Sequence, residues 1–119
     1  MLKFTKDHAM SLDIGRFSPK PGSVTPGQQE ALVYLIGNAN SAVKAGVWEC
    51  TPGRFTVNRA TTEICEILSG RATLIDENKN ELTLAPGDHV MVPKGFKGDW
   101  VIHETVRKIF VIHPEAPSP

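Results

Sequence analysis

The sequence predicts an all-β protein that folds as an antiparallel sandwich or barrel. Short apolar segments follow one another from residue 31 onward, and glycine, proline, asparagine and serine separate them at close intervals. No window after residue 31 keeps the three-four spacing of apolar residues that an amphipathic helix requires. The 119 residues suffice for one hydrophobic core. We therefore expect a single domain of many short strands.

The turn residues place the strands in chain order. Residues 1–30 contain scattered prolines and glycines, which indicate an irregular N-terminal arm with room for one short strand around 12–17. The proline-rich residues 114–119 are expected to form a flexible tail. Between them, in a domain spanning 31–113, we expect strands at 31–36, 43–50, 53–59, 62–69, 71–76, 80–84, 88–92, 97–103 and 106–112.

Composition excludes several classes of partner. Lysine plus arginine equals aspartate plus glutamate at 13 each, so nothing indicates a nucleic-acid or anionic membrane surface. No apolar run approaches the roughly 20 residues that span a bilayer, and the first ten residues do not resemble a signal peptide. We expect a cytoplasmic protein whose two cysteines, Cys50 and Cys65, are reduced and buried.

Alternation along the strands sorts residues between two faces, both of which are mixed. Glu63 and Cys65 share a face with Ile67, whereas Ile64 and Glu66 point the other way. In the last strand, Lys108 shares a face with Val106, Phe110 and Ile112, which is an unusual placement for a lysine. The strand that contains Glu63 is expected to have a core side and a side that faces a cavity or a partner.

Glycines, a proline and a glutamate recur at a diagnostic spacing. Six residues separate Glu63 from Gly70 in a first motif. Gly87, Pro93 and Gly95 form a second motif with its own spacing. This pattern resembles the cupins of the RmlC-like superfamily, most of all the (S)-ureidoglycine aminohydrolase-like and ethanolamine-utilisation (EutQ-like) branch. The resemblance implies a double-stranded β-helix jelly roll, also called a cupin barrel.

The resemblance also implies a divalent metal held by three histidines and a carboxylate. No register of the first motif places a histidine at a ligand position, and Gly98 stands where the last histidine belongs. Trp100 is expected to point into the barrel from the same face as Gly98. We predict no resident cofactor and no metal at the usual site. A different metal site would combine Glu63, Glu66 or Cys65 with a histidine from elsewhere.

Glu63 is the main candidate for a functional role. It is either a general acid or base, or an anchor for a cationic ligand inside the barrel, or a buried carboxylate in an ion pair with Arg59 or Lys108. Arg59 would clamp a carboxylate, or remain solvated. The aromatic residues either stack on a flat or quaternary-amine ligand or fill the barrel. The expected ligand-binding set is Arg59, Glu63, Cys65, Trp48, Phe55, Trp100 and Lys108.

Three functions remain open from the sequence. The first is a cupin that binds a small polar or nitrogen-containing metabolite in the barrel mouth. The second is an aminohydrolase-like or isomerase-like enzyme that uses Glu63 as acid or base. The third is a structural or regulatory dimer that binds through its sheet face. A homodimer is expected in any case, because small jelly rolls leave strand edges and apolar faces to cover.

Overall fold

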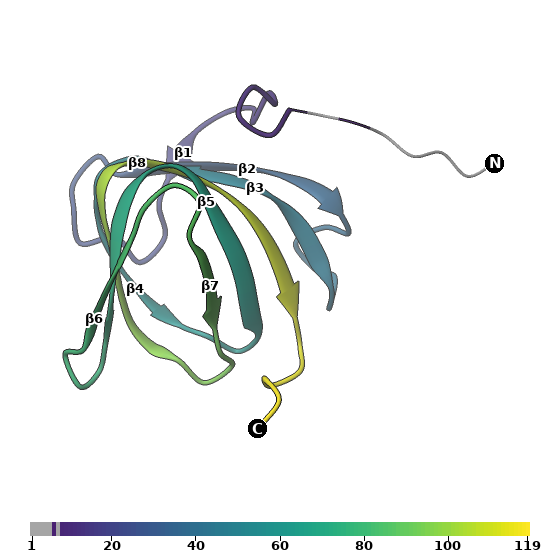
Figure 1. The fold of residues 1–119 in the computed structure, drawn as a ribbon. Helices are drawn as coiled ribbons and strands as arrows, with labels where there is room; N and C mark the ends of the chain where they lie inside the picture. The colour runs from purple at the N-terminus through teal and green to yellow at the C-terminus, as the bar shows by residue number, and fades with distance from the viewer. Residues whose placement is uncertain (1–5, 7) are drawn as a thin grey trace.

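The computed structural model describes residue 6 and residues 8–119. These residues contain no helix, and so none long and apolar enough to cross a membrane. They form eight strands of one bent antiparallel sheet (Figure 1). The strands are β1 (Ser18–Pro19), β2 (Gln29–Ile36), β3 (Lys44–Cys50), β4 (Gly53–Asn58), β5 (Thr62–Asp76), β6 (Glu81–Leu84), β7 (His89–Val92) and β8 (Lys97–His113).

The two longest strands, β5 and β8, pair with each other along their whole length. On its other edge, each long strand pairs with two shorter strands. β4 pairs with the first half of β8, and β3 pairs with the second half. Likewise β7 pairs with the first half of β5 and β6 with the second. Both long strands therefore run through the two opposed walls of the barrel. The expected jelly roll is confirmed.

Two strand boundaries predicted from sequence are wrong. The segments 62–69 and 71–76 form the single strand β5, and 97–103 and 106–112 form the single strand β8. The separate strands predicted at 62–69 and 71–76 imply a turn at Gly70, but Gly70 lies in a bulged corner of β5, where its φ is 86° and the register with β8 shifts. A Cβ built on Gly70 would come within 2.1 Å of the Thr105 carbonyl oxygen. A glycine therefore marks a bend as well as a hairpin.

Gly87 and Pro93 lie just before and just after β7, and β6 and β7 do not form a hairpin with each other. Gly87 has a φ of 91° and lies in the turn between β6 and β7, but each of these strands pairs with β5 and not with the other. Pro93 directly follows β7, so its missing N–H interrupts no strand pairing, as expected.

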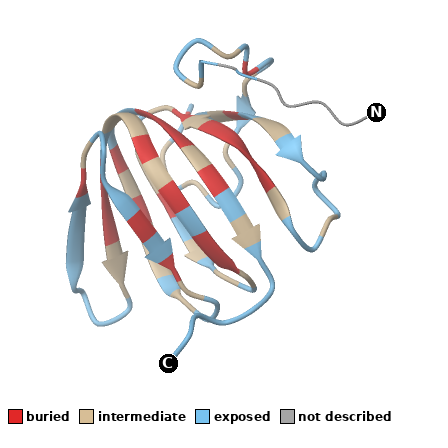
Figure 2. Cartoon of the chain, turned by 45° about the vertical axis from the view of Figure 1, so that its right-hand side comes forward, coloured by how far each residue is buried: buried red, intermediate tan, exposed pale blue. Residues whose placement is uncertain are grey.

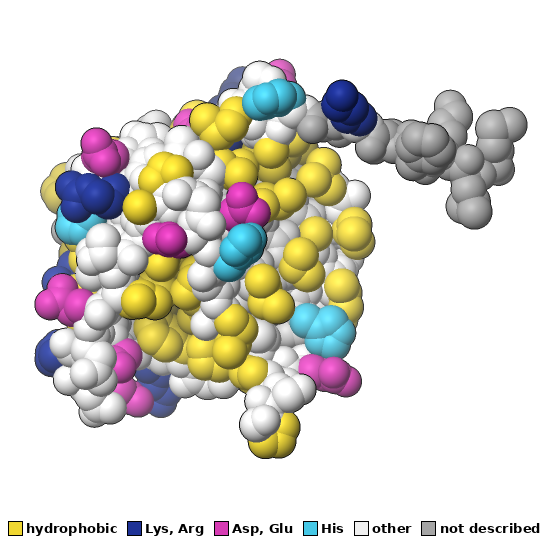
Figure 3. Space-filling view, in the orientation of Figure 1, with side chains coloured by type: hydrophobic (Ala, Val, Ile, Leu, Met, Phe, Trp, Pro, Cys, Tyr) yellow, Lys and Arg dark blue, Asp and Glu magenta, His cyan; other side chains and the backbone are white. Residues whose placement is uncertain are grey.

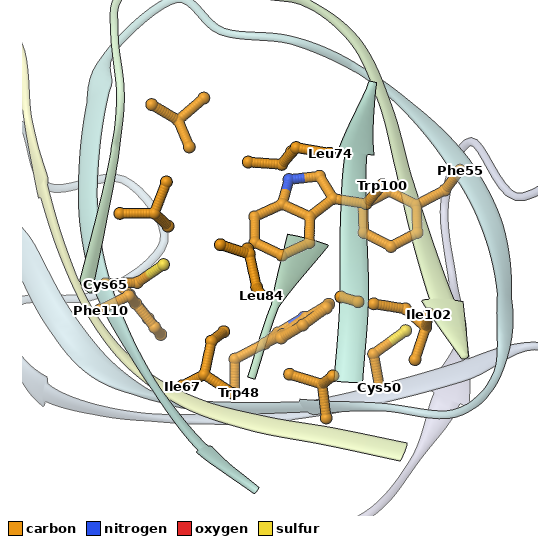
Figure 4. Packing of buried hydrophobic residues seen from close by; sticks show 14 residues of the cluster. Trp48, Cys50, Phe55, Cys65, Ile67, Leu74, Leu84, Trp100, Ile102 and Phe110 are labelled. Carbon is orange, nitrogen blue, oxygen red and sulfur yellow. The ribbon is translucent and has the colours of Figure 1, made fainter. Parts of the chain in front are cut away.

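The core lies between the two walls of the barrel. Buried positions alternate along the strands (Figure 2), and Glu63, Cys65 and Ile67 face inward, as predicted. Trp100, only 1% exposed, also points into the barrel. Trp48, Trp100 and Phe55 meet near its centre (Figure 4), with Phe55 stacked on Trp100 at 6.4 Å between ring centroids. Aromatic side chains therefore fill part of the barrel interior.

The N-terminal arm packs on the outer surface of its own barrel. The short strand expected at 12–17 does not form; Ile14 instead is buried against Ala31 and Val47. The buried Arg107 donates hydrogen bonds of 2.9 Å to the carbonyls of Ala9 and Leu12. The arm is thus held to β2, β3 and β8 by apolar contacts and one arginine.

The Gly70 corner can be tested with a pair of alanine variants. Gly87→Ala places an alanine at a position whose φ is already positive, with nothing within 4 Å of its Cβ, and we expect it to cost about 1–2 kcal/mol of unfolding free energy. Gly70→Ala adds the clash with Thr105, for a further loss of about 1–3 kcal/mol. Urea denaturation measures both. Equal losses would contradict the close approach of β5 and β8 at this corner.

A candidate ligand pocket in the barrel

An open pocket of about 200 Å³ enters the barrel. Most of its walls come from β2, β3, β4, β5 and β8. Lys20, which follows β1, and Arg59, which follows β4, complete it. The lining residues are Lys20, Glu30, Leu32, Tyr34, Lys44, Trp48, Phe55, Val57, Arg59, Glu63, Trp100, Lys108, Phe110 and Ile112.

An ion pair between Lys108 and Glu63 lies in this pocket. The Lys108 Nζ is 2.8 Å from the Glu63 Oε2, and the two side chains are only 7% and 5% exposed. The backbones of these residues are not directly opposite, because Lys108 pairs with Ile67 and Glu63 with Ile112. The lysine stem therefore extends along β5 to reach the carboxylate. Of the two cations considered as partners of Glu63, the structure pairs it with Lys108.

The same ammonium lies between two indole rings. Lys108 Nζ is 4.4 Å from the ring centroid of Trp48 and 4.4 Å from that of Trp100. Both contacts are within the range of cation–π attraction, which grows stronger where the cation is desolvated. The protein's own lysine therefore occupies the aromatic faces that the sequence left open to an external amine.

A second charged pair, absent from the sequence-based site, lies at the arm side of the pocket. Lys20 Nζ is 3.5 Å from Glu30 Oε1 and 4.4 Å from the Phe55 ring centroid. Trp48 Nε1 donates a 2.8 Å hydrogen bond to the same Glu30 oxygen. The predicted strand began at residue 31. Had it begun at residue 29, alternation would have placed Glu30 on the same face as Leu32 and Tyr34 and indicated it as a pocket residue. No local signal indicated Lys20.

Arg59 lies on the pocket wall, as the sequence suggested. Its guanidinium donates to the carbonyl of Thr61 at 3.4 Å and to the Thr61 hydroxyl at 2.9 Å. Cys65, placed with the ligand-binding residues from sequence, is instead a buried core residue that does not line the pocket. Both cysteines are free and buried. Burial raises the pKa of Cys65 to about 11 and that of Cys50 to about 12, so neither is a reactive thiolate near neutral pH.

Comparison with known proteins places this barrel in a family. Residues 37–110, more than half of the chain, match the model of the EutQ-like cupin domain. The chain belongs to this family. The resemblance drawn from the glycine, proline and glutamate spacing is confirmed. No curated protein matches the chain.

Several solved structures share the fold at low sequence identity. A Pseudomonas syringae protein of unknown function from the DUF861 family is 27% identical with a TM-score of 0.70, over 83% of this chain and 45% of that one. This chain thus spans about half the length of that protein. A Rhizobium leguminosarum protein of unknown function is 23% identical, with a TM-score of 0.70 over 96% and 100% of the two chains. The Clostridium difficile EutQ protein is 20% identical, with a TM-score of 0.66 over 78% and 76%.

The residues of this cupin do not fit the metal ion that the superfamily resemblance implies. Residues 6 and 8–119 contain no group of three or more histidine, cysteine, aspartate or glutamate side chains able to hold a metal. At Gly98, the position of the last histidine, a Cβ would come within 2.1 Å of the Ile75 carbonyl oxygen. The Glu63 carboxylate is already bound by Lys108. His89 and His103 instead contact Glu66 and Thr73.

The energetic role of the buried ion pair can be tested by removing one or both charges. Lys108→Met leaves a buried carboxylate without its partner, and we expect a loss of about 3–5 kcal/mol in unfolding free energy. In the double variant Glu63→Leu/Lys108→Met most of this loss is expected to be recovered, because no buried charge remains.

The matched control is Arg71→Met, which breaks the exposed Arg71–Glu104 pair of 3.5 Å and is expected to cost less than about 1 kcal/mol. Chemical denaturation of the four proteins measures these differences. A Lys108→Met loss no larger than that of Arg71→Met would show that the pair is not buried in solution.

Proposed function

We propose that this EutQ-like cupin binds a small polar molecule in its barrel pocket, around Glu63 and Lys108. The observation that carries the proposal is the buried ion pair at an open cavity. Desolvating two charges is expensive, and apolar side chains of similar volume are often at least as stable in such places. A charged pair within aromatic walls supports recognition of a ligand better than it supports stability. Two free, buried cysteines also favour the cytoplasm as its location.

An enzymatic role at the same pocket is the alternative. The Glu63 carboxylate and the Lys108 ammonium are 2.8 Å apart, a distance at which a carboxylate can take a proton and a neighbouring cation can stabilise developing negative charge. An aminohydrolase or isomerase reaction would use Glu63 as the acid or base. The aminohydrolase substrate class rests on family resemblance alone, and a fold does not determine a reaction.

We further propose that two copies associate through the outer face of the sheet. Met91, Ile64 and Val111 are neighbours in register across β7, β5 and β8, and their exposures are 45%, 54% and 46%. The next positions in register are Ala45 on β3, which is already buried, and Ile36 on β2, which is 59% exposed. Figure 3 shows hydrophobic side chains gathered over this part of the molecule. A two-fold dimer would bury the same row on both copies.

Ligand binding can be tested by tryptophan fluorescence, since the chain's two tryptophans both line the pocket. We expect at least one compound from a panel of amines, ureides and small carboxylates to change the emission and raise the Tm. The double variant Glu63→Leu/Lys108→Met should lose this response. Glu66→Gln, on the outer face of the same strand, should keep it. A response that survives in the double variant would exclude this pocket.

Dimer formation can be tested by sedimentation. We expect a dimer for the native chain and a monomer for Ile64→Glu, because the substitution places two carboxylates in an apolar contact. Val24→Glu, an equally drastic change at an exposed position of the arm region, should remain dimeric. A native chain that sediments as a monomer at micromolar concentration would contradict the proposal.

A further inference from the structure

We propose that the pocket selects a small organic dianion, a dicarboxylate about the size of succinate, and that Lys108 is its anchoring cation. This inference rests on the proposed ligand-binding function and narrows it to one class of compound. In this cupin a fixed ammonium, rather than a metal ion, supplies the positive charge inside the barrel.

The lining of the pocket is positively charged. Its charged groups are four cations, Lys20, Lys44, Arg59 and Lys108, and two carboxylates, Glu30 and Glu63. Each carboxylate has a lysine of its own, Lys20 for Glu30 and Lys108 for Glu63. Lys44 and Arg59 donate to neutral acceptors instead, the Ala39 carbonyl and Thr61. The pocket therefore carries two positive charges in excess, which favour a ligand with two negative charges.

The contacts of the Lys108 ammonium also favour an anionic ligand. An ammonium group has three N–H donors, and one of them is directed to Glu63. The indoles of Trp48 and Trp100 hold the cation in place through their faces, but a carboxylate is a far stronger acceptor than a ring. Because Lys108 also lines the cavity, a ligand carboxylate can bind the ammonium from the open side.

The aromatic faces of the pocket already hold cations. Lys108 lies over Trp48 and Trp100, and Lys20 lies over Phe55, in each case 4.4 Å from the ring centroid. A quaternary amine would have to displace these lysines and would meet their like charge. The pocket that looked suited to an amine from its tryptophans is thus suited to an anion.

The size and depth of the pocket suit a ligand with a carboxylate at each end. Its volume of about 200 Å³ equals the share of about seven water molecules in the liquid. Lys44 pairs with Ile112 at the end of β8, and Arg59 precedes β5 at the same end of the barrel, where Thr62 pairs with His113. These two cations lie toward the rim, whereas Lys108 is set deeper on β8. One carboxylate would bind Lys108 and the other the rim, with the apolar spacer along Phe110 and Ile112.

A charge series of matched length tests this selection. Succinate, succinamide and 1,4-diaminobutane have similar size and carry two negative charges, none and two positive charges. We expect succinate to change the tryptophan emission in a saturable way. Succinamide and the diamine should bind at least about tenfold more weakly. Succinamide or the diamine binding as tightly as succinate would overturn the anion inference while leaving the pocket proposal intact.

Variants locate the two ends of the ligand. Arg59→Gln and Lys44→Gln should each weaken succinate at least about threefold, and Lys97→Gln, an exposed lysine at the start of β8, should not. Lys108→Met should abolish binding; if it does not fold, the charge series and the rim variants still decide. Succinate binding unaffected by both rim variants would overturn the two-ended arrangement. No change of emission with any compound of any charge would count against both the inference and the pocket proposal.

Discussion

The full-length pairing of β5 with β8 is the constraint on which the rest of the structure depends. Both strands bend together at the Gly70 corner, where the close approach to Thr105 leaves no space for a side chain. Bending lets one pair of strands contribute to both walls of the barrel, so the remaining strands need only attach to their free edges. The same strand pairing makes Glu63 and Lys108 neighbours on the inner face of the sheet. The fold and the pocket thus have a common origin.

The buried ion pair is held by features that offset the desolvation of its charges. The carboxylate and ammonium contact each other at 2.8 Å, and two indole faces flank the ammonium at 4.4 Å. No buried side-chain nitrogen or oxygen in the described part of the chain lacks a hydrogen-bond partner, as expected for a native interior. These contacts keep a charge fixed in an apolar setting, where electrostatic interactions are stronger than in water.

Local patterns in the sequence predicted most of the fold, because strand alternation and turn chemistry are local properties. Alternation grouped Glu63 with Cys65 and Ile67, and together with the cupin register it directed Trp100 into the barrel. Glu63, Trp100 and Lys108 all lie on the inner face. It did not separate a bulge from a hairpin at Gly70, since both conformations favour a glycine with positive φ. Lys20 and its contact with Glu30 were missed because the pairing depends on how the arm returns to the barrel, which no short window contains. At Gly98 the sequence was informative because the histidine that the cupin motif has at this position is absent.

The arm links the outer surface of the barrel to its interior. Arg107 and Ile14 fix the arm to the convex side of the sheet, while Lys20, a few residues further on, reaches the pocket and contacts Glu30. Glu30 accepts a hydrogen bond from the Trp48 indole, and Trp48 in turn borders the Lys108 ammonium. A continuous set of polar and cation–π contacts therefore runs from Lys20 through Trp48 to Glu63. Since Lys20 also lines the pocket, the arm forms part of the pocket wall and not only a cover for the sheet.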